Sequence, residues 1–131
     1  MVTVKDRSDA KSRAIIAVEY FAAKLKIPLG RIACLSPYSP ENSSLAGGKV
    51  GDYKTTDKLD VWRSNQAVWL SSIKAFKGLE ADALVLTDLP DFKPGVFDKA
   101  DFYVACSRAK LLLVVLTNSA EVAKCAIQVV Q

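Results

Sequence analysis

Three short apolar runs constrain the fold of this chain more than any other feature of its sequence. They span residues 31–36 (RIACLS), 83–88 (ALVLTD) and 111–117 (LLLVVLT), and turn-forming or charged residues bound them. Runs of this length without polar alternation are typical of strands that are covered on both faces. Such strands occur in parallel sheets that carry helices on each side, so the sequence predicts an α/β fold with an open, three-layer parallel sheet.

Helical periodicity precedes the first run. Residues 9–26 repeat apolar side chains at three- and four-residue steps, Ser8 or Asp9 is the expected N-cap, and Pro28 and Gly30 follow the end. This amphipathic pattern predicts one long helix that packs on the sheet. Its expected core face consists of Ala14, Ile15, Val18, Phe21, Ala22 and Leu25.

The remaining segments predict further elements. We expect a helix over residues 97–110, with Phe102, Ala105 and Ala109 facing inward, and a buried strand over residues 111–117. Short strands are expected at residues 59–62 and 67–71, with a loop and one helical turn over residues 74–81. Residues 37–58 are rich in proline, serine and glycine and should be mostly irregular. A last helix, capped by Asn118 or Ser119, is expected to bury Val122, Ala126, Ile127 and Val130.

The composition of the chain limits the number of domains and the catalytic mechanisms that it can have. The 131 residues suit one domain, with an N-terminal helix within residues 1–30, a core over residues 31–117 and a C-terminal helix within residues 118–131. The absence of histidine excludes Ser-His-Asp and Cys-His mechanisms and most catalytic zinc sites. Three scattered cysteines predict buried, reduced thiols. We expect a cytoplasmic protein without a membrane partner, and its net charge of +4 is compatible with a polyanionic one.

Two segments carry the chemistry. In residues 71–80 (SSIKAFKGLE), hydroxyl groups, two lysines and a glycine amide can bind phosphate, and Glu80 can accept hydrogen bonds from a ribose. In residues 103–110 (YVACSRAK), Arg108 lies among small residues that would let its guanidinium reach a facing phosphate. Taken singly, the first is also consistent with a polar turn, and the second with cations that offset a helix dipole.

Together, the two segments resemble the UvrD/Rep-like superfamily 1 DNA/RNA helicases. In that family, motif V reads Thr-x-His-x-x-Lys-Gly-Leu-Glu before a strand, and motif VI reads Val-Ala-x-Thr-Arg-Ala. This chain has matching residues in the same order, with strands where the family has them, and residues 31–39 resemble the motif IV region less specifically. The resemblance covers about residues 31–117 and implies a RecA-like second motor lobe with the P-loop NTPase type of fold.

The resemblance also implies roles for individual residues. Arg108 matches the arginine that reaches the γ-phosphate of ATP, and Glu80 matches the carboxylate near the ribose, with Lys77 and Gly78 beside it. Ser71, Ser72 and Lys74 occupy the segment that meets a single-stranded nucleic acid. The implied partners are that strand and the N-terminal RecA-like lobe of a parent chain, in which ATP and Mg²⁺ would be held.

Several departures from the family pattern qualify these roles. Lys74 replaces the motif V histidine and Ser107 the motif VI threonine, and the motif IV neighbourhood lacks the usual arginine, for which Arg31 is a poor substitute. No Gly-x-x-x-x-Gly-Lys-[Ser/Thr] phosphate loop and no Walker B strand occur in the sequence. We therefore expect no ATPase activity, and no bound cofactor, in this polypeptide alone.

Two alternatives remain open at this point. The chain can be a non-catalytic helicase-like module that binds nucleic acid or protein, or an unrelated α/β ligand-binding domain of the flavodoxin-like type. Trp62 and Trp69 can stack on bases, but core or edge packing is the better interpretation.

Overall fold

The apolar runs form a mostly parallel sheet, as predicted. A computed structural model describes the backbone of residues 2–4 and 6–130 and the side chains of residues 3, 4 and 6–126. Within these residues the sheet has the order β1-β7-β6-β2-β5-β4-β3, and β3 alone runs antiparallel to its neighbour. The strands are β1 (Val2–Thr3), β2 (Ile32–Ser36), β3 (Lys49–Val50), β4 (Tyr53–Thr56), β5 (Val68–Ser72), β6 (Ala81–Leu89) and β7 (Ala109–Thr117).

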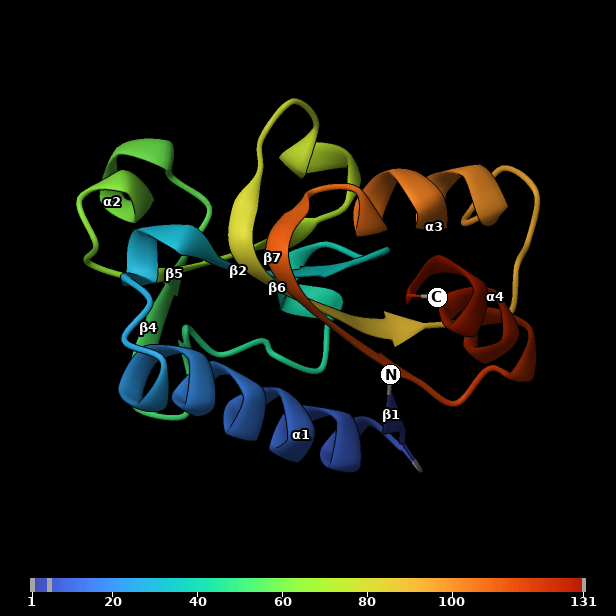
Figure 1. Cartoon of the computed structure of the whole chain (residues 1–131), viewed down its shortest axis with the longest axis horizontal. Coiled ribbons are helices and arrows are strands. Elements are labelled where there is room, and N and C mark those ends of the chain that lie inside the picture. The colour runs from blue at the N-terminus through green and yellow to red at the C-terminus, as the bar shows by residue number, and fades with distance from the viewer. Residues whose placement is uncertain (1, 5, 131) are drawn as a thin grey trace.

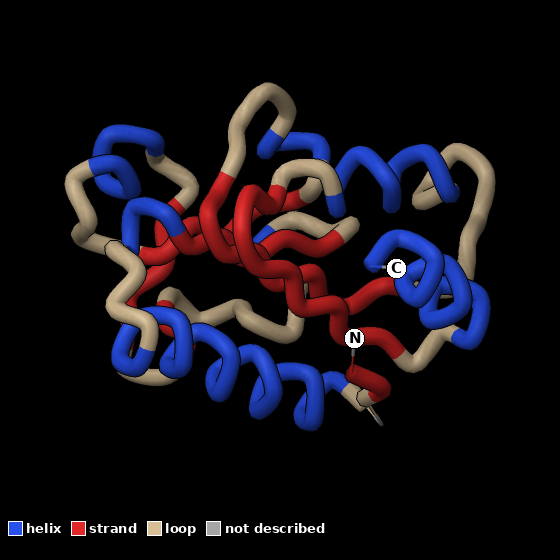
Figure 2. The backbone as a smooth tube through the Cα atoms, in the orientation of Figure 1, coloured by secondary structure: helices blue, strands red, loops and turns tan. Residues whose placement is uncertain are grey.

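Helices cover both faces of the sheet (Figures 1 and 2). One face packs against α1 (Arg7–Glu19) and the π-helical turn that continues it, Tyr20–Lys24. The other face packs against α2 (Leu59–Arg63), the 3-10 turn η4 (Lys74–Phe76), α3 (Lys99–Cys106) and α4 (Ala120–Val130). Two further 3-10 turns, Leu29–Arg31 and Pro40–Asn42, lie in connections. None of the described helices has the length and apolar character needed to cross a membrane.

The first helix starts earlier than expected. Asp6 is its N-cap, because the carboxylate of Asp6 accepts a hydrogen bond of 2.9 Å from the amide of Asp9, so the predicted cap at Ser8 or Asp9 was wrong. The predicted core face is confirmed at Ala14, Val18 and Phe21, which are buried. Leu25 is 42% exposed, because the helix has ended in the π-helical turn before it.

The strand predicted at residues 59–62 is instead the short helix α2. Its Trp62 side chain is 3% exposed, and the indole Nε1 donates to the carbonyl oxygens of Leu29 and Ile32, both at 3.0 Å. These long-range contacts fix the segment in a conformation that its apolar pattern does not specify. The segment predicted to be irregular contains the β3–β4 hairpin, and the N-terminal strand β1 was not predicted.

The last predicted helix is confirmed as α4, and the one before it is shorter than expected. The Ser119 hydroxyl accepts from the amide of Val122 at 3.2 Å, so the Ser119 cap is correct. Val122 and Ala126 are buried, whereas the predicted burial of Ile127 and Val130 concerns side chains outside the described residues. Helix α3 ends at residue 106, because residues from 109 onward pair with β6 as part of β7.

Strand β7 is less buried than its apolar sequence predicts. Leu111 is 73% exposed, although residues 115–117 are buried. Leu111 lies at a register shift between β6 and β7, and β1 pairs only with Leu116 and Thr117, so no described strand flanks the outer edge of β7 at this point. The prediction of a fully buried strand was therefore wrong for its first half.

All three cysteines are free and buried, as predicted. Burial raises the pKa of the Cys34 thiol to about 12. Burial likewise raises the pKa of Cys106 to about 12, partly offset by a hydrogen bond with the backbone. Both thiols therefore stay protonated at neutral and mildly alkaline pH, and the nucleophilic thiolate is scarce.

This burial predicts slow alkylation of the native protein. At pH 8 we expect iodoacetamide to modify Cys34 and Cys106 at least about 100-fold more slowly in native chain than in urea-unfolded chain, because unfolding restores an ordinary thiol pKa. Mass spectrometry of timed samples measures the two rates. Equal rates in native and unfolded chain would contradict the burial of these thiols.

Candidate functional site: a groove between η4 and α3

The two predicted motif segments lie side by side. Residues 71–80 connect β5 to β6 through η4, and residues 103–110 connect α3 to β7. The amide of Ala81 donates to the carbonyl oxygen of Arg108 at 2.9 Å, which joins the end of one segment to the other. Strands β6 and β7 continue this contact in parallel register, beginning with Ala81 opposite Ala109.

The two motifs do not both follow the carboxyl ends of strands. Ser71 and Ser72 end β5, whereas Glu80 immediately precedes β6 and Arg108 immediately precedes β7. Because these strands are parallel, Glu80 and Arg108 lie at the opposite edge of the sheet from the two serines. The connection through η4 passes from one edge to the other, so a single motif is divided between both edges.

A groove of about 480 Å³ lies between η4 and α3. Its floor is apolar and three cationic side chains line it, namely Lys74 and Lys77 from the first motif and Arg108 from the second. The carboxylate of Asp101 also lines the groove, but it accepts a hydrogen bond of 3.1 Å from the amide of Asp98 as part of the α3 capping box. The other lining residues are Ile73, Phe76, Ala100, Val104 and Ala105.

Arg108 is held by its backbone while its side chain lacks a complete set of partners. Its amide donates to the carbonyl oxygen of Ala105 at 3.1 Å, and its own carbonyl accepts from Ala81. The Nε of the guanidinium is buried and has no hydrogen-bond partner among the described residues. A buried donor without a partner is costly, so this nitrogen is a candidate donor to a ligand.

Glu80 and Gly78 lie beside the groove and do not line it. The Glu80 carboxylate is 3.9 Å from the Lys110 ammonium, and both side chains are more than half exposed, so this ion pair contributes little to stability. Gly78 has a φ of 82°, which favours glycine, and a side chain at this position would meet no atom within 4 Å. The space over the Gly78 backbone is therefore open to a ligand.

The serine hydroxyls are used within the protein. Ser71 is 2% exposed; its hydroxyl accepts from the indole Nε1 of Trp69 at 2.7 Å and donates to the carbonyl of Ser72 at 2.8 Å. The Ser72 hydroxyl accepts from the amide of Ala75 at 3.2 Å, which fixes the start of η4. Of the three residues predicted to meet a nucleic acid, Lys74 is the one with an exposed side chain.

Two other sequence interpretations concern the tryptophans and Arg31. Trp62 and Trp69 are both buried, so the core interpretation is confirmed and base stacking is excluded in this conformation. Arg31 donates to the Asp82 carboxylate at 3.3 Å, in an ion pair that leaves the arginine side chain 65% exposed.

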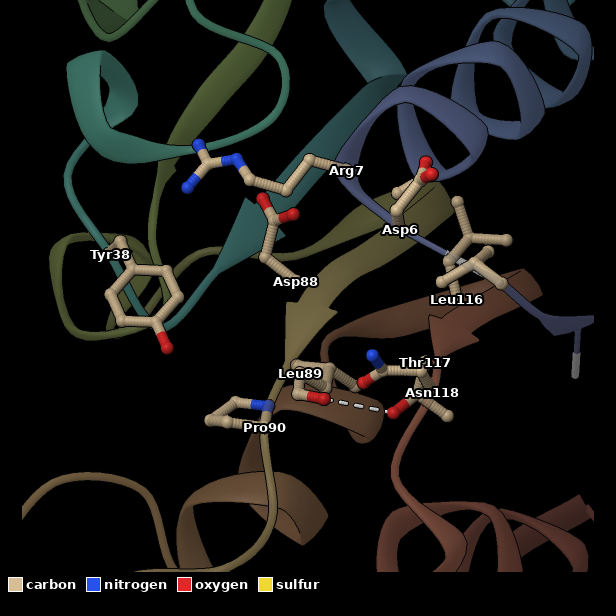
Figure 3. Close-up of a pocket in the computed structure, with 11 residues that line it drawn as sticks. Asp6, Arg7, Tyr38, Asp88, Leu89, Pro90, Leu116, Thr117 and Asn118 are labelled. Carbon is tan, nitrogen blue, oxygen red and sulfur yellow. Dashed lines mark hydrogen bonds between the residues drawn. The ribbon is translucent and has the colours of Figure 1, made fainter.

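A second cavity, of about 400 Å³, lies at the carboxyl edge of the sheet and was not predicted (Figure 3). Asp6, Arg7, Tyr38, Asp88 and Asn118 line it with polar side chains. The available sequence signals were weak, because these residues come from four separate segments. The run TDLP, an aspartate at the end of a strong strand followed by proline, is the clearest of them.

Comparison with known proteins adds no assignment. No protein-family model matches the sequence, and no curated protein matches it.

Proposed function

We propose that this chain is the C-terminal motor lobe of an ATP-dependent superfamily 1 DNA/RNA helicase, with a RecA-like fold. In this proposal the groove between η4 and α3 faces the nucleotide, and Arg108 supplies the arginine that meets the γ-phosphate. The lobe needs an N-terminal RecA-like lobe, because its own sequence contains no phosphate loop. The observation that carries the proposal is that Lys77 and Arg108, one from each motif, line the same groove, with Lys74 at the start of η4 beside them.

The residues of the groove fit a phosphate group. Arginine and lysine are the side chains that proteins use most to bind phosphate. The Nε of Arg108 has no hydrogen-bond partner among the described residues, so it is free to donate to a phosphate oxygen. ATP would supply the phosphoanhydride bond whose hydrolysis drives movement. Arg108 would bind and orient the terminal phosphate, with Lys77 at the rim, and the open backbone at Gly78 would admit the ribose beside Glu80.

Lys74 is placed for a separate role along the strand-binding surface. It lies at the start of η4, directly after the carboxyl end of β5, with an exposed side chain. An exposed ammonium group at this position can follow the phosphates of a single strand without reading its bases. Ser71 and Ser72 support this surface indirectly, because they fix the end of β5 and the start of η4.

The test of the strand-binding surface uses the isolated chain and a fluorescein-labelled oligothymidine. We expect weak, sequence-independent binding that falls with salt, and Lys74→Ala should reduce the salt slope by about 1 and weaken affinity several-fold. Lys11→Ala is the matched control, since Lys11 is an exposed lysine on α1, over the other face of the sheet. Fluorescence anisotropy measured across a salt series gives both quantities.

Two outcomes would contradict this assignment. Affinity that does not change with salt would exclude a surface that follows phosphates. If the Lys74 and Lys11 variants lose the same affinity for the oligothymidine, the loss reflects net charge and not the position of Lys74. That result would favour a module that binds nucleic acid through its overall charge.

A further inference from the structure

The cavity at the carboxyl edge lies where the connections of the sheet diverge. Strand β2 leads toward β3, β4 and β5 on one side, and β6 leads to β7 on the other. Ligands of open α/β sheets bind outside the carboxyl ends of strands at such a point. The lining comes from the ends of β6 and β7, the residues after β1, and Tyr38 after β2 (Figure 3).

A β-bulge at the end of β6 places Asp88 at this cavity. Leu86 pairs with Val115 and Leu89 pairs with Thr117, so β6 has one more residue than β7 between these pairs. Asp88 takes up the extra residue with a φ of 58°, an uncommon conformation for a residue other than glycine. Bulges of this kind redirect side chains and occur often beside binding sites.

The charged residues of the cavity are each held by one hydrogen bond. Asp88 Oδ2 accepts from the amide of Ser44 at 2.8 Å, Asp6 Oδ1 accepts from the amide of Asp9 at 2.9 Å, and Arg7 Nη2 donates to the carbonyl of Asn42 at 2.8 Å. Their positions are therefore fixed before any ligand arrives.

Polar atoms remain for a ligand after these bonds are made. Four groups form no hydrogen bond to another described residue. They are the second carboxylate oxygens of Asp6 and Asp88, the Tyr38 hydroxyl and the Asn118 amide. Figure 3 shows Asp88, Tyr38 and Asn118 among the residues around the cavity, with the Asp88 carboxylate directed toward Arg7. The cavity thus combines unused donors, unused acceptors and an apolar floor.

This combination identifies the chemical class of the ligand. Two carboxylates against one guanidinium disfavour a phosphate, and the two carboxylates are too few for a metal cage of protein ligands. A hydroxyl group both donates and accepts, so it suits acceptors and donors that lie close together. The Tyr38 ring and Pro90 offer an apolar surface for the C–H face of a ring.

We propose that this cavity binds a small polyhydroxylated ring, either a monosaccharide or the ribose of a nucleoside. The Asp88 carboxylate and the Asn118 amide bind vicinal hydroxyl groups, and the Tyr38 ring packs on the apolar face of the sugar. The volume of about 400 Å³ is sufficient for such a ligand. The site lies at the opposite edge of the sheet from Arg108, so it stands independently of the nucleotide groove.

The experiment is an NMR titration of the ¹⁵N-labelled chain with methyl β-D-ribofuranoside, D-glucose, adenosine and 2′,3′-dideoxyadenosine. We expect saturable shifts in the amides of Asp6, Tyr38, Asp88 and Asn118 with a ligand that carries vicinal hydroxyls, and none with the dideoxynucleoside. Shifts with the riboside or glucose identify a free sugar as the ligand, and shifts with adenosine alone identify a nucleoside.

Variants separate binding from folding. Asp88→Asn keeps an acceptor for the Ser44 amide but replaces the free oxygen by a donor, so we expect affinity to fall about 10-fold or more. Asn118→Ala, at an exposed position, provides a second variant if the first perturbs the bulge, and Asp60→Asn on α2 is the control. The proposal is overturned if no ligand shifts these amides up to its solubility limit, or if dideoxyadenosine binds as well as adenosine.

Discussion

Replacing Arg108 by alanine is expected to lower ATP turnover by about 10³-fold or more in an assembly of this lobe with a phosphate-loop lobe. The expected loss corresponds to about 4 kcal/mol or more of barrier. In the proposed role, the donors of the arginine fork would meet charge that develops on the terminal phosphate in the transition state. Because this charge is greatest in the transition state, the affinity for ATP itself should fall much less.

Two further variants and a stability measurement make this prediction specific. Arg108→Lys retains the charge without the planar fork and should recover only a small part of the turnover. Lys110→Ala removes a neighbouring cation, 3.9 Å from Glu80, and should leave turnover within a few-fold of the parent. Urea unfolding of each variant separates catalytic loss from destabilisation. Full turnover in Arg108→Ala with retained folding would exclude the arginine from the reaction.

The central sheet could be predicted because its signal is local. Strands β2 and β6 contain apolar runs that are buried on both faces, as runs of this kind indicate, whereas the run in β7 is buried only in its second half. Helix α1 was predictable from apolar residues repeated at three- and four-residue steps. These residues pack with Cys34 and Val85 on one face of the sheet. Its cap was not, because Asp6, Ser8 and Asp9 are all good caps and only geometry selects among them.

The elements that were missed depend on distant contacts. Residues 59–62 contain apolar residues suited to a strand, but the two hydrogen bonds from the Trp62 indole hold them as a helical turn against residues 29–32. Strands β1 and β3 have two residues each, too few for a pattern to show. The exposure of Leu111 accompanies a register shift against β6 and a short β1, and neither can be read from the apolar run of β7 alone.

The residues of the candidate site could be predicted from the sequence, but their arrangement in space could be predicted only in part. Motif spacing identified Lys74, Lys77 and Arg108, which do meet at one groove. The position of Glu80 and Arg108 before their strands follows from the path of the chain through η4, which sequence periodicity does not give. The burial of Ser71 is set by its hydrogen bond with Trp69, a contact that motif matching ignores.

The groove depends on an aromatic cluster beneath it. The ring of Trp62 lies 5.3 Å from that of Trp69 and 5.7 Å from that of Phe76, and the rings of Trp69 and Phe76 are 5.8 Å apart. Phe76 is fully buried and ends η4, which carries Lys74. The cluster therefore fixes the wall of the groove as well as the core of this face.

Trp62→Ala is accordingly expected to lower the free energy of unfolding by about 3–5 kcal/mol, because it leaves a large cavity and removes the indole N–H that is shared between the carbonyls of Leu29 and Ile32. A loss of this size is a large fraction of the stability of a single domain. Chemical denaturation followed by circular dichroism measures it. Tyr20→Ala is the control: it removes an aromatic ring that is 53% exposed, and it should change stability by less than about 1 kcal/mol.

Trp62→Phe separates packing from hydrogen bonding. It keeps a ring against Trp69 and Phe76 but leaves the carbonyls of Leu29 and Ile32 without the indole donor. If the hydrogen bonds hold α2 in its helical turn, this variant should lose about 1 kcal/mol, the net contribution of the lost indole donor, since the Leu29 carbonyl still accepts from the amide of Ile32. A loss near zero in Trp62→Phe together with a large loss in Trp62→Ala would mean that ring packing alone selects the helix. The hydrogen bonds of the Trp62 indole would then not explain why residues 59–62 form a helical turn instead of a strand.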